Sequence, residues 1–387
     1  MNRIVLFALS ALLHFYVGWR LIPSLAKWPG AAWALAITLM LSYVLMHLGL
    51  HFRRHTSRFT NYLSWASMTA MGLFSSLFVL TVLRDVLLML AALIAWILPV
   101  AWVSFNAISS RELATATALL VPSCAFAITV IGMWNARRTA SVVQVDVPIA
   151  GLPDALHGFT IAQVSDIHVG PTIKGPYVDS IVRAVNRLNA DMVAVTGDLV
   201  DGSVAELGPH VSPLANLSSR HGTFFVTGNH EYYSGAHAWI AELRRLGLRV
   251  LMNEHVVLKH DTAALVIAGV TDVSAHHFDP AHRSSPEVAI ADAPDHVLIR
   301  VLLAHQPRSA FEAANAGFHL QLSGHTHGGQ FWPWNFFVRL QQPFTAGLHR
   351  LNDLWVYVSR GTGYWGPPKR FGAPSEITHL RLVRVGG

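Results

Sequence analysis

The stretch FTIAQVSDIHVG, residues 159–170, joins an apolar run to a polar tail. The run is typical of a strand buried on both faces, and Asp166 and His168 follow at its carboxyl end. Open α/β sheets place their ligand sites at the carboxyl ends of the strands. This stretch therefore predicts a strand of an α/β sheet that presents two candidate metal-binding side chains.

Similar segments continue to the end of the chain. We predict further strands at 191–198, 222–229, 264–272, 297–305, 318–325, 354–361 and 376–385. Between them, 177–189 and 236–247 carry apolar residues at helical spacing. This alternation predicts a layered α/β domain over residues 157–387.

Polar side chains recur where these predicted strands end. Asp198 follows one strand in a Gly-Asp pair, GNHE (228–231) follows the next, His305 ends a later strand, and GHTH (324–327) follows another. Each element alone is more typical of a turn or of a paired histidine. Their recurrence at five strand ends indicates one functional constellation.

In this order and spacing, the series resembles the calcineurin-like metallophosphoesterases. The strings GHTHGGQ (324–330) and VSRGTGYWGPPKRFGAPSEI (358–377), with apolar segments before them, are similar to the subgroup of transmembrane proteins with a metallophosphoesterase domain. Some members of that subgroup hydrolyse the diphosphate of UDP-2,3-diacylglucosamine. The resemblance implies a β-sandwich flanked by helices and a centre of two divalent metal ions.

The resemblance also implies a role for each residue of the series. The implied metal ligands are Asp166, His168 and His327 for one ion and Asn229, His305 and His325 for the other, with Asp198 bridging both. His230 would be catalytic and would face the substrate. The implied reaction is hydrolysis of a phosphoester or diphosphate bond by a metal-bridging hydroxide. Imidazole, carboxylate and amide ligands suit Mn, Fe or Zn better than Ca.

The first part of the chain has the composition of a membrane protein. Of the 387 residues, 52% are hydrophobic and 13% are charged. Apolar runs long enough to cross a bilayer occupy 4–19, 31–50, 61–83, 86–105 and 114–134. We predict an all-α membrane domain of about five transmembrane helices over residues 1–138, followed by a linker at 139–156. Only Arg84-Asp85 separates the third and fourth runs, so four helices are the alternative.

Charge is divided unevenly between the two parts. Residues 1–138 hold ten Lys or Arg residues and two acidic residues, a formal charge of +8, whereas the remainder carries −2. The α/β part therefore lacks the excess of positive charge that is typical of proteins that bind nucleic acid. Cys124 is the only cysteine, which excludes disulfides within the chain and Cys-based zinc sites. We expect an integral multi-pass protein of a bacterial cytoplasmic membrane, with membrane lipids as neighbours. The Lys and Arg residues in the loops between the predicted helices are equally divided between the two sides of the membrane. The loop charge therefore does not indicate on which side the catalytic domain lies.

Two features bear on the substrate. Arg370 in PPKRFG could bind a phosphate bidentately, although an arginine beside prolines is more often a surface residue. Trp332 and Trp334 lie in the aromatic run FWPWNFFVRL (331–340), which could form core or an apolar lip at a lipid interface.

The substrate expected from these features is lipid-linked, such as a nucleotide-lipid of the UDP-diacylglucosamine type. Other phosphodiesters and polyprenyl diphosphates are alternatives, as is a catalytically silent membrane scaffold or sensor with the same fold.

Overall fold

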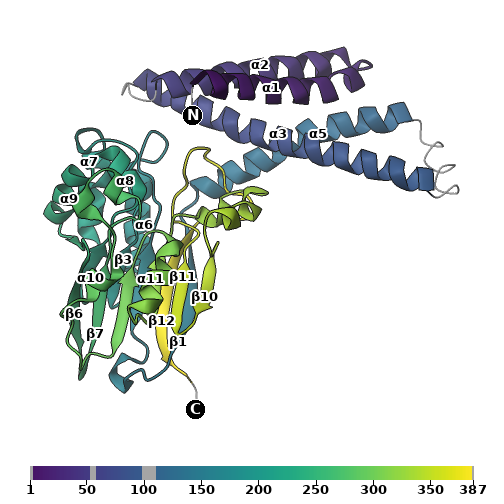
Figure 1. Cartoon of the computed structure of the whole chain (residues 1–387). Helices are drawn as coiled ribbons and strands as arrows, with labels where there is room; N and C mark the ends of the chain where they lie inside the picture. The colour runs from purple at the N-terminus through teal and green to yellow at the C-terminus, as the bar shows by residue number, and fades with distance from the viewer. Residues whose placement is uncertain (1–2, 53–57, 98–109, 386–387) are drawn as a thin grey trace. The chain divides into compact units, whose positions relative to one another are not determined.

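The computed structural model describes residues 3–52, 58–97 and 110–385 (Figure 1). The chain divides into two compact units. The helical unit comprises Met1–Trp134 with Gly366–Lys369, and the α/β unit comprises Asn135–Trp365 with Arg370–Gly387. The units are described separately below.

In its described residues, the helical unit contains four helices that are long and apolar enough to cross a membrane. They are α1 (Arg3–Leu21), α2 (Pro29–Phe52), α3 (Arg58–Ile97) and α5 (Ser110–Arg137). Large apolar side chains stand exposed along them, among them Phe15, Trp33 and Trp96. Such surfaces are stable in hydrocarbon and costly in water, which agrees with the membrane domain predicted from composition.

The described residues contain four such helices, the alternative to the five that were predicted. The runs 61–83 and 86–105 do not form two helices, because α3 continues through Arg84 and Asp85 to Ile97; residues 98–105 lie outside the described part. Asp85 accepts hydrogen bonds from Arg20 Nε at 2.7 Å and from Arg84 Nη1 at 3.1 Å. The two charges are satisfied by neighbours within the helical unit, so no polar turn is needed at this point.

The α/β unit is built on two six-stranded sheets. The first has the order β1 (Ser141–Ile149), β12 (Glu376–Arg384), β2 (Thr160–Val164), β3 (Met192–Val195), β4 (Thr223–Phe225) and β5 (Arg249–Val250). The second has the order β10 (Gly347–Leu351), β11 (Leu354–Val358), β9 (Leu320–Ser323), β8 (Ile299–Leu303), β7 (Ala263–Gly269) and β6 (Glu254–His260). Strands β2 to β5 run parallel in the first sheet, as do β7, β8, β9 and β11 in the second.

Helices cover the sandwich on both sides. Side chains such as Ile161, Met192, Ile267 and Val301 are fully buried in one apolar cluster that draws on strands of both sheets. The helices are α6 (Gly175–Asn186), α7 (Val204–Val211), α8 (Asn229–Ser234) and α9 (Ala236–Arg245), together with α10 (Pro286–Ile290) and α11 (Ala310–Asn315). The predicted α/β fold, a β-sandwich flanked by helices, is confirmed.

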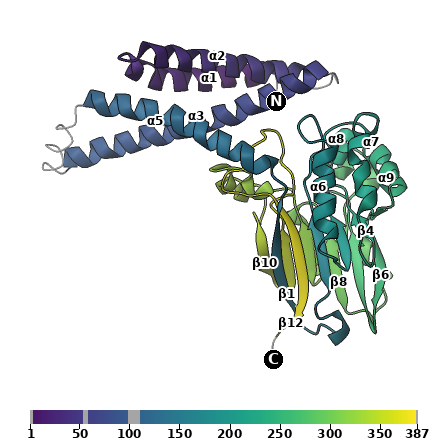
Figure 2. The same ribbon diagram turned by 180° about the vertical axis from the view of Figure 1, so that it is seen from behind.

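The stretch 139–156, predicted to be a linker, contains strand β1. This strand pairs in parallel with β12 from Ser141↔Glu376 to Ile149↔Arg384, and the two lie side by side in Figure 2. Pro148 suggested a linker, but β1 is an edge strand, where a residue without an N–H is tolerated. The stretch is part of the α/β unit, which begins at Asn135.

Candidate metal centre

The predicted site residues lie at one end of the two sheets. Asp166 and His168 follow β2, and Asp198 follows β3. Asn229 begins α8 after β4, His305 follows β8, and the GHTH segment at 324–327 follows β9. Because parallel strands end at the same edge of a sheet, these short tails are brought together.

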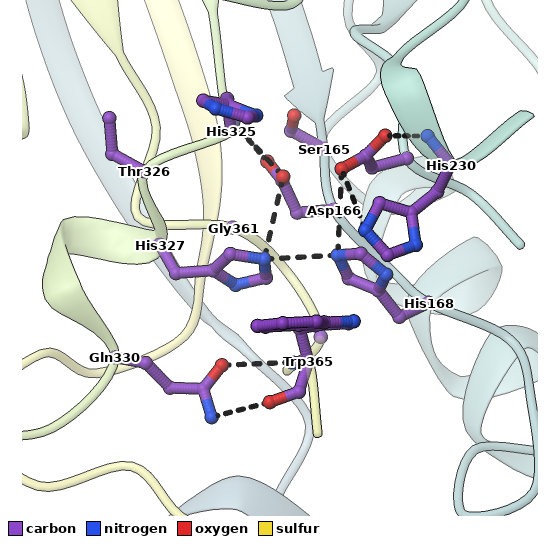
Figure 3. A network of polar contacts seen from close by, with 12 residues as sticks. Ser165, Asp166, His168, His230, His325, Thr326, His327, Gln330, Gly361 and Trp365 are labelled. Carbon is purple, nitrogen blue, oxygen red and sulfur yellow. Dashed lines mark hydrogen bonds and ion pairs between the residues drawn. The ribbon is translucent and has the colours of Figure 1, made fainter. Parts of the chain in front are cut away.

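Side chains from both sheets converge at this edge (Figure 3). His168 Nε2 lies 3.0 Å from His327 Nε2, and His305 Nε2 lies 3.2 Å from His325 Nδ1. Asp198 Oδ2 lies 3.1 Å from His305 Nε2 and 3.9 Å from His168 Nε2. Asp198 therefore lies between two pairs of imidazoles, as a shared ligand would.

The backbone at five of these residues adopts a left-handed conformation. The φ angles are 55° at Asp166, 55° at His168, 52° at Asp198, 70° at His325 and 52° at His327. Residues other than glycine adopt this conformation at an energetic cost and usually where the surrounding structure requires it. Its concentration at the predicted site indicates that the fold holds these side chains for a function.

Glycines allow the carboxylates to approach the main chain. A Cβ atom at Gly324 would lie 2.2 Å from Asp166 Oδ2, and one at Gly228 would lie 2.2 Å from Asp198 Oδ1. No side chain fits at such distances. The glycines of the GHTH and GNHE motifs are therefore part of the geometry of the site.

Neighbouring groups orient the imidazole rings. His305 Nδ1 lies 2.7 Å from the Thr196 carbonyl oxygen, and His168 Nδ1 lies 3.3 Å from Asp201 Oδ1. In both rings this arrangement directs Nε2 toward the centre of the site. Such contacts fix the tautomer and orientation of histidines that bind metals.

Asp201 was not predicted from the sequence. Its Oδ1 atom is bonded to His230 Nδ1 as well as to His168 Nδ1, so one carboxylate orients both rings. The available signal was its position three residues after Asp198 in GDLVDG, 197–202. Position alone could not distinguish it from a turn residue.

Glu231 holds together two of the loops that carry the site. Its fully buried carboxylate accepts hydrogen bonds from the backbone N–H groups of Gly228 at 2.7 Å, Asp198 at 2.9 Å and Leu199 at 2.7 Å. These bonds join the end of β4 to the end of β3. These contacts indicate that Glu231 supports the loops that carry the candidate ligands.

The protonation of the histidines suits metal binding. Burial, with the neighbouring His305, lowers the pKa of His325 to about 3. Burial, with the neighbouring His168, holds the pKa of His327 well below its ordinary value. Both rings are therefore neutral at physiological pH, which is the form that binds metal ions.

His230 has the opposite electrostatic environment. Burial lowers the pKa of His230, but the hydrogen bond to Asp201 and the nearby Asp198 carboxylate outweigh burial and raise it to about 9. Its Nε2 atom lies 4.0 Å from Asp198 Oδ2. This environment favours the protonated form of the ring, in contrast to His325 and His327.

The residues present fit two divalent ions. Asn229 Oδ1 is buried and has no hydrogen-bond partner among the described residues, as expected for an oxygen that binds a cation. The candidate ligands are Asp166, His168 and His327 for one ion and Asn229, His305 and His325 for the second, with Asp198 shared. Two such ions would act as Lewis acids on a phosphoryl group and as activators of water.

Trp365 forms part of the wall of this site. Its ring lies beside the His168–His327 pair in Figure 3, and its centroid is 5.7 Å from that of His230. The Gln330 side chain holds the Trp365 backbone, accepting from its N–H at 2.8 Å and donating to its carbonyl at 2.9 Å. Sequence reasoning assigned Trp365 no role.

Arg370 does not face an open phosphate site. Its side chain is fully buried, and Nη1 donates to the carbonyl oxygens of His327 at 2.9 Å and Ala373 at 3.3 Å. Nε donates to the Gly363 carbonyl oxygen at 3.1 Å, and Nη2 lies 3.1 Å from His327 Nδ1. In this structure Arg370 supports the loop that carries His327 instead of contacting solvent.

The aromatic run 331–340 is mostly exposed. Phe331 is buried, but Trp332, Trp334, Phe336 and Phe337 are 36%, 41%, 64% and 53% exposed. The run stays next to the GHTH motif because the Asn335 backbone approaches Gly329, where a Cβ atom would lie 2.2 Å from Asn335 Cα. Of the two predicted alternatives, core or lip, the exposure favours the lip.

Comparisons with known proteins agree with this geometry. The family model for calcineurin-like phosphoesterases matches residues 159–329. A transmembrane protein with metallophosphoesterase domain from Bos taurus is 41% identical over 299 residues, which cover 73% of this chain and 66% of the relative. An uncharacterized metallophosphoesterase from Aquifex aeolicus is 36% identical over 229 residues, which cover 58% of this chain and 85% of the relative. The chain thus spans slightly under two thirds of the length of the Bos taurus relative.

Proposed function

Because the chain belongs to the calcineurin-like metallophosphoesterase family, we propose that it is a membrane-anchored metallophosphoesterase that hydrolyses phosphoester or diphosphate bonds of a lipid-linked substrate. The family uses a dinuclear metal centre. The observation that carries the proposal is the convergence of seven candidate ligands from both sheets, with Asp198 between the two histidine pairs. Imidazole, carboxylate and amide ligands of this kind suit Mn, Fe or Zn.

His230 is the proposed proton donor. Its Nδ1 atom is bonded to Asp201, so Nε2 is the atom available to a bound substrate. A proton from Nε2 to the departing oxygen would stabilise the leaving group. Asp201 acts on this step as a positioning residue, because it holds the ring in place.

A lipid-linked substrate is supported by the apolar surfaces of the chain. The four apolar helices imply attachment to a membrane, here proposed to be the bacterial cytoplasmic membrane and to be crossed several times. The exposed segment from Trp332 to Leu340 follows the GHTH motif and supplies an apolar surface for acyl chains. A nucleotide-lipid of the UDP-diacylglucosamine type carries both the diphosphate and the acyl chains that these features would bind.

Metal reconstitution of the purified full-length protein tests the proposal. Chelation should abolish hydrolysis of a soluble phosphodiester and of a diacylated nucleotide diphosphate, and Mn²⁺ should restore both activities. His230→Asn should lower turnover and leave metal content unchanged, whereas Asp261→Asn, at an exposed ion pair with Arg220, should change neither. Activity that survives complete metal removal would contradict the proposal, and metal binding without turnover on any phosphoester would favour a silent scaffold.

A further inference from the structure

A second cluster of metal-capable side chains lies outside the candidate metal centre. His237 lies in the first turn of α9, while Asp279 and His282 lie in the segment between β7 and α10. One ligand atom from each lies within 4.8 Å of the other two. We propose that these three side chains form a separate binding site for a divalent cation, with Zn²⁺ as the ion that matches them.

The spacing of the ligand atoms suits one small ion. Asp279 Oδ2 lies 3.1 Å from His237 Nε2 and 3.8 Å from His282 Nε2. Zinc bonds of about 2.0–2.2 Å place neighbouring ligand atoms of a tetrahedral site about 3.3 Å apart. The two distances to Asp279 bracket this value, so each histidine already lies at a suitable spacing from the carboxylate.

The remaining polar atoms of two ligands are held by other groups. His282 Nδ1 lies 3.0 Å from the Tyr232 hydroxyl, and Asp279 Oδ1 accepts a hydrogen bond from the Ala281 N–H at 2.9 Å. Each contact directs the other atom, His282 Nε2 or Asp279 Oδ2, toward the cluster. Histidines that bind metals are commonly oriented through the second ring nitrogen in this manner.

The donor set defines the class of ion. Two imidazoles and one carboxylate are typical of zinc sites, whereas calcium requires six or more oxygen ligands. The His237 side chain is 74% exposed, so water can complete the coordination. Without a metal, the same three groups would form only an ion pair between Asp279 and a protonated histidine.

The segment that carries Asp279 and His282 is anchored at both ends. Asp272 accepts hydrogen bonds from Gln306 Nε2 at 3.2 and 3.0 Å, and the Arg283 carbonyl oxygen accepts one from Asn253 Nδ2 at 2.8 Å. An ion held by Asp279 and His282 would add an anchor to α9 between these two ends. Segment 272–283 would then be fixed along its length.

This segment reaches the candidate metal centre through aromatic contacts. Phe278 precedes Asp279, and its ring centroid is 5.6 Å from that of Tyr233. The Tyr233 centroid is in turn 5.2 Å from that of His230. A metal ion at the new site would therefore restrict the motion of Phe278 and Tyr233 beside His230. It would supply no ligand to the catalytic ions.

Metal content of the full-length protein in detergent tests the proposal. After loading with Zn²⁺ and removal of loosely bound ions, elemental analysis should find one ion per chain fewer in His237→Gln/His282→Gln than in the wild type. His276→Gln is the matched control, because His276 lies in the same segment and contacts the Val273 carbonyl oxygen instead of the cluster. Equal zinc content in the double variant and the wild type would overturn the proposal.

Two further variants separate loss of the zinc ion from misfolding of the chain, and the proposed site from the catalytic metal centre. Asp279→Asn retains the size of the side chain and should cause the same loss of one ion. In an Asp198→Ala chain, one zinc ion should remain, and a further His282→Gln substitution should remove it. Hydrogen exchange across 274–283 should slow on zinc addition in the wild type but not in the double variant, and an unchanged rate in the wild type would contradict the anchoring role.

Discussion

Two stretches that meet near Gln330 use their side chains in opposite ways. From His325 to Gln330, polar groups are bonded within the α/β unit: the His325 N–H donates to Asp166 at 3.0 Å and the His327 carbonyl oxygen accepts from Arg370. From Trp332 to Leu340, large apolar side chains face outward, and Leu340 is 81% exposed. The polar groups of the first stretch are bonded within the unit, whereas the second stretch leaves a group of large apolar side chains exposed.

The largest expected effect comes from breaking the buried centre. Asp198→Ala removes the side chain between the two histidine pairs, so both ions should be lost. Metal ions contribute several kcal/mol to phosphoryl transfer, and a loss of about 4 kcal/mol corresponds to about a thousandfold in rate. Activity on soluble and acylated substrates should fall equally, as measured by steady-state kinetics and elemental analysis. Retention of two ions per chain would show that Asp198 is not the shared ligand.

The second effect concerns where the buried unit begins. A chain starting at Asn135 retains β1, and a chain starting at Gly151 lacks it. Val147 and Ile149 are buried in β1, and each such side chain contributes about 1.5–3 kcal/mol. The shorter chain should melt about 10 °C lower or fail to fold, as followed by circular dichroism. Identical melting curves would restore the interpretation of 139–156 as a linker.

A third variant loosens the buried stretch without removing a proposed ligand. Arg370→Ala deletes the donors that hold the His327 carbonyl oxygen and the neighbouring loop. Changes of this kind beside a metal site lower metal affinity about 10–100-fold. Metal titration and melting curves should show weaker binding and lower stability, with Arg370→Lys intermediate. Arg384→Ala, at an exposed ion pair, is the control, and unchanged metal affinity in Arg370→Ala would exclude the positioning role.

The smallest effect concerns the exposed stretch alone. Trp334→Ala combined with Phe336→Ala should raise KM for an acylated substrate about tenfold and leave a small soluble diester unaffected. Each acyl CH₂ that loses contact costs about 0.8 kcal/mol, so two methylenes account for this change. Phe311→Ala, which removes an exposed aromatic ring from α11, should alter neither substrate. Equal loss on both substrates together with a lower melting temperature would instead indicate that the aromatic run packs as core.

Much of this architecture could be predicted from local sequence patterns. Every strand predicted from an apolar run is present, including β2 and β3, because burial on both faces requires consecutive apolar residues. The candidate ligands could be identified because they follow those strands directly, as Asp166 follows β2. Strands β1, β5, β6 and β10, which form the edges of the two sheets, were missed, since edge strands are only partly buried and resemble loops.

The sequence by itself determined the α/β class, the two-part composition and the series of metal-capable residues. Each of these follows from the spacing of apolar residues along the chain or from short motifs. Tertiary structure alone decided that Asp201 orients His168 and His230, that Arg370 is buried behind His327, and that α3 runs unbroken through Arg84 and Asp85. The positions of these side chains depend on contacts between residues that are far apart in the sequence. A charged residue can end at a surface, in a turn or in a buried hydrogen-bond network, and its partners in the folded chain decide which of these has the lowest free energy.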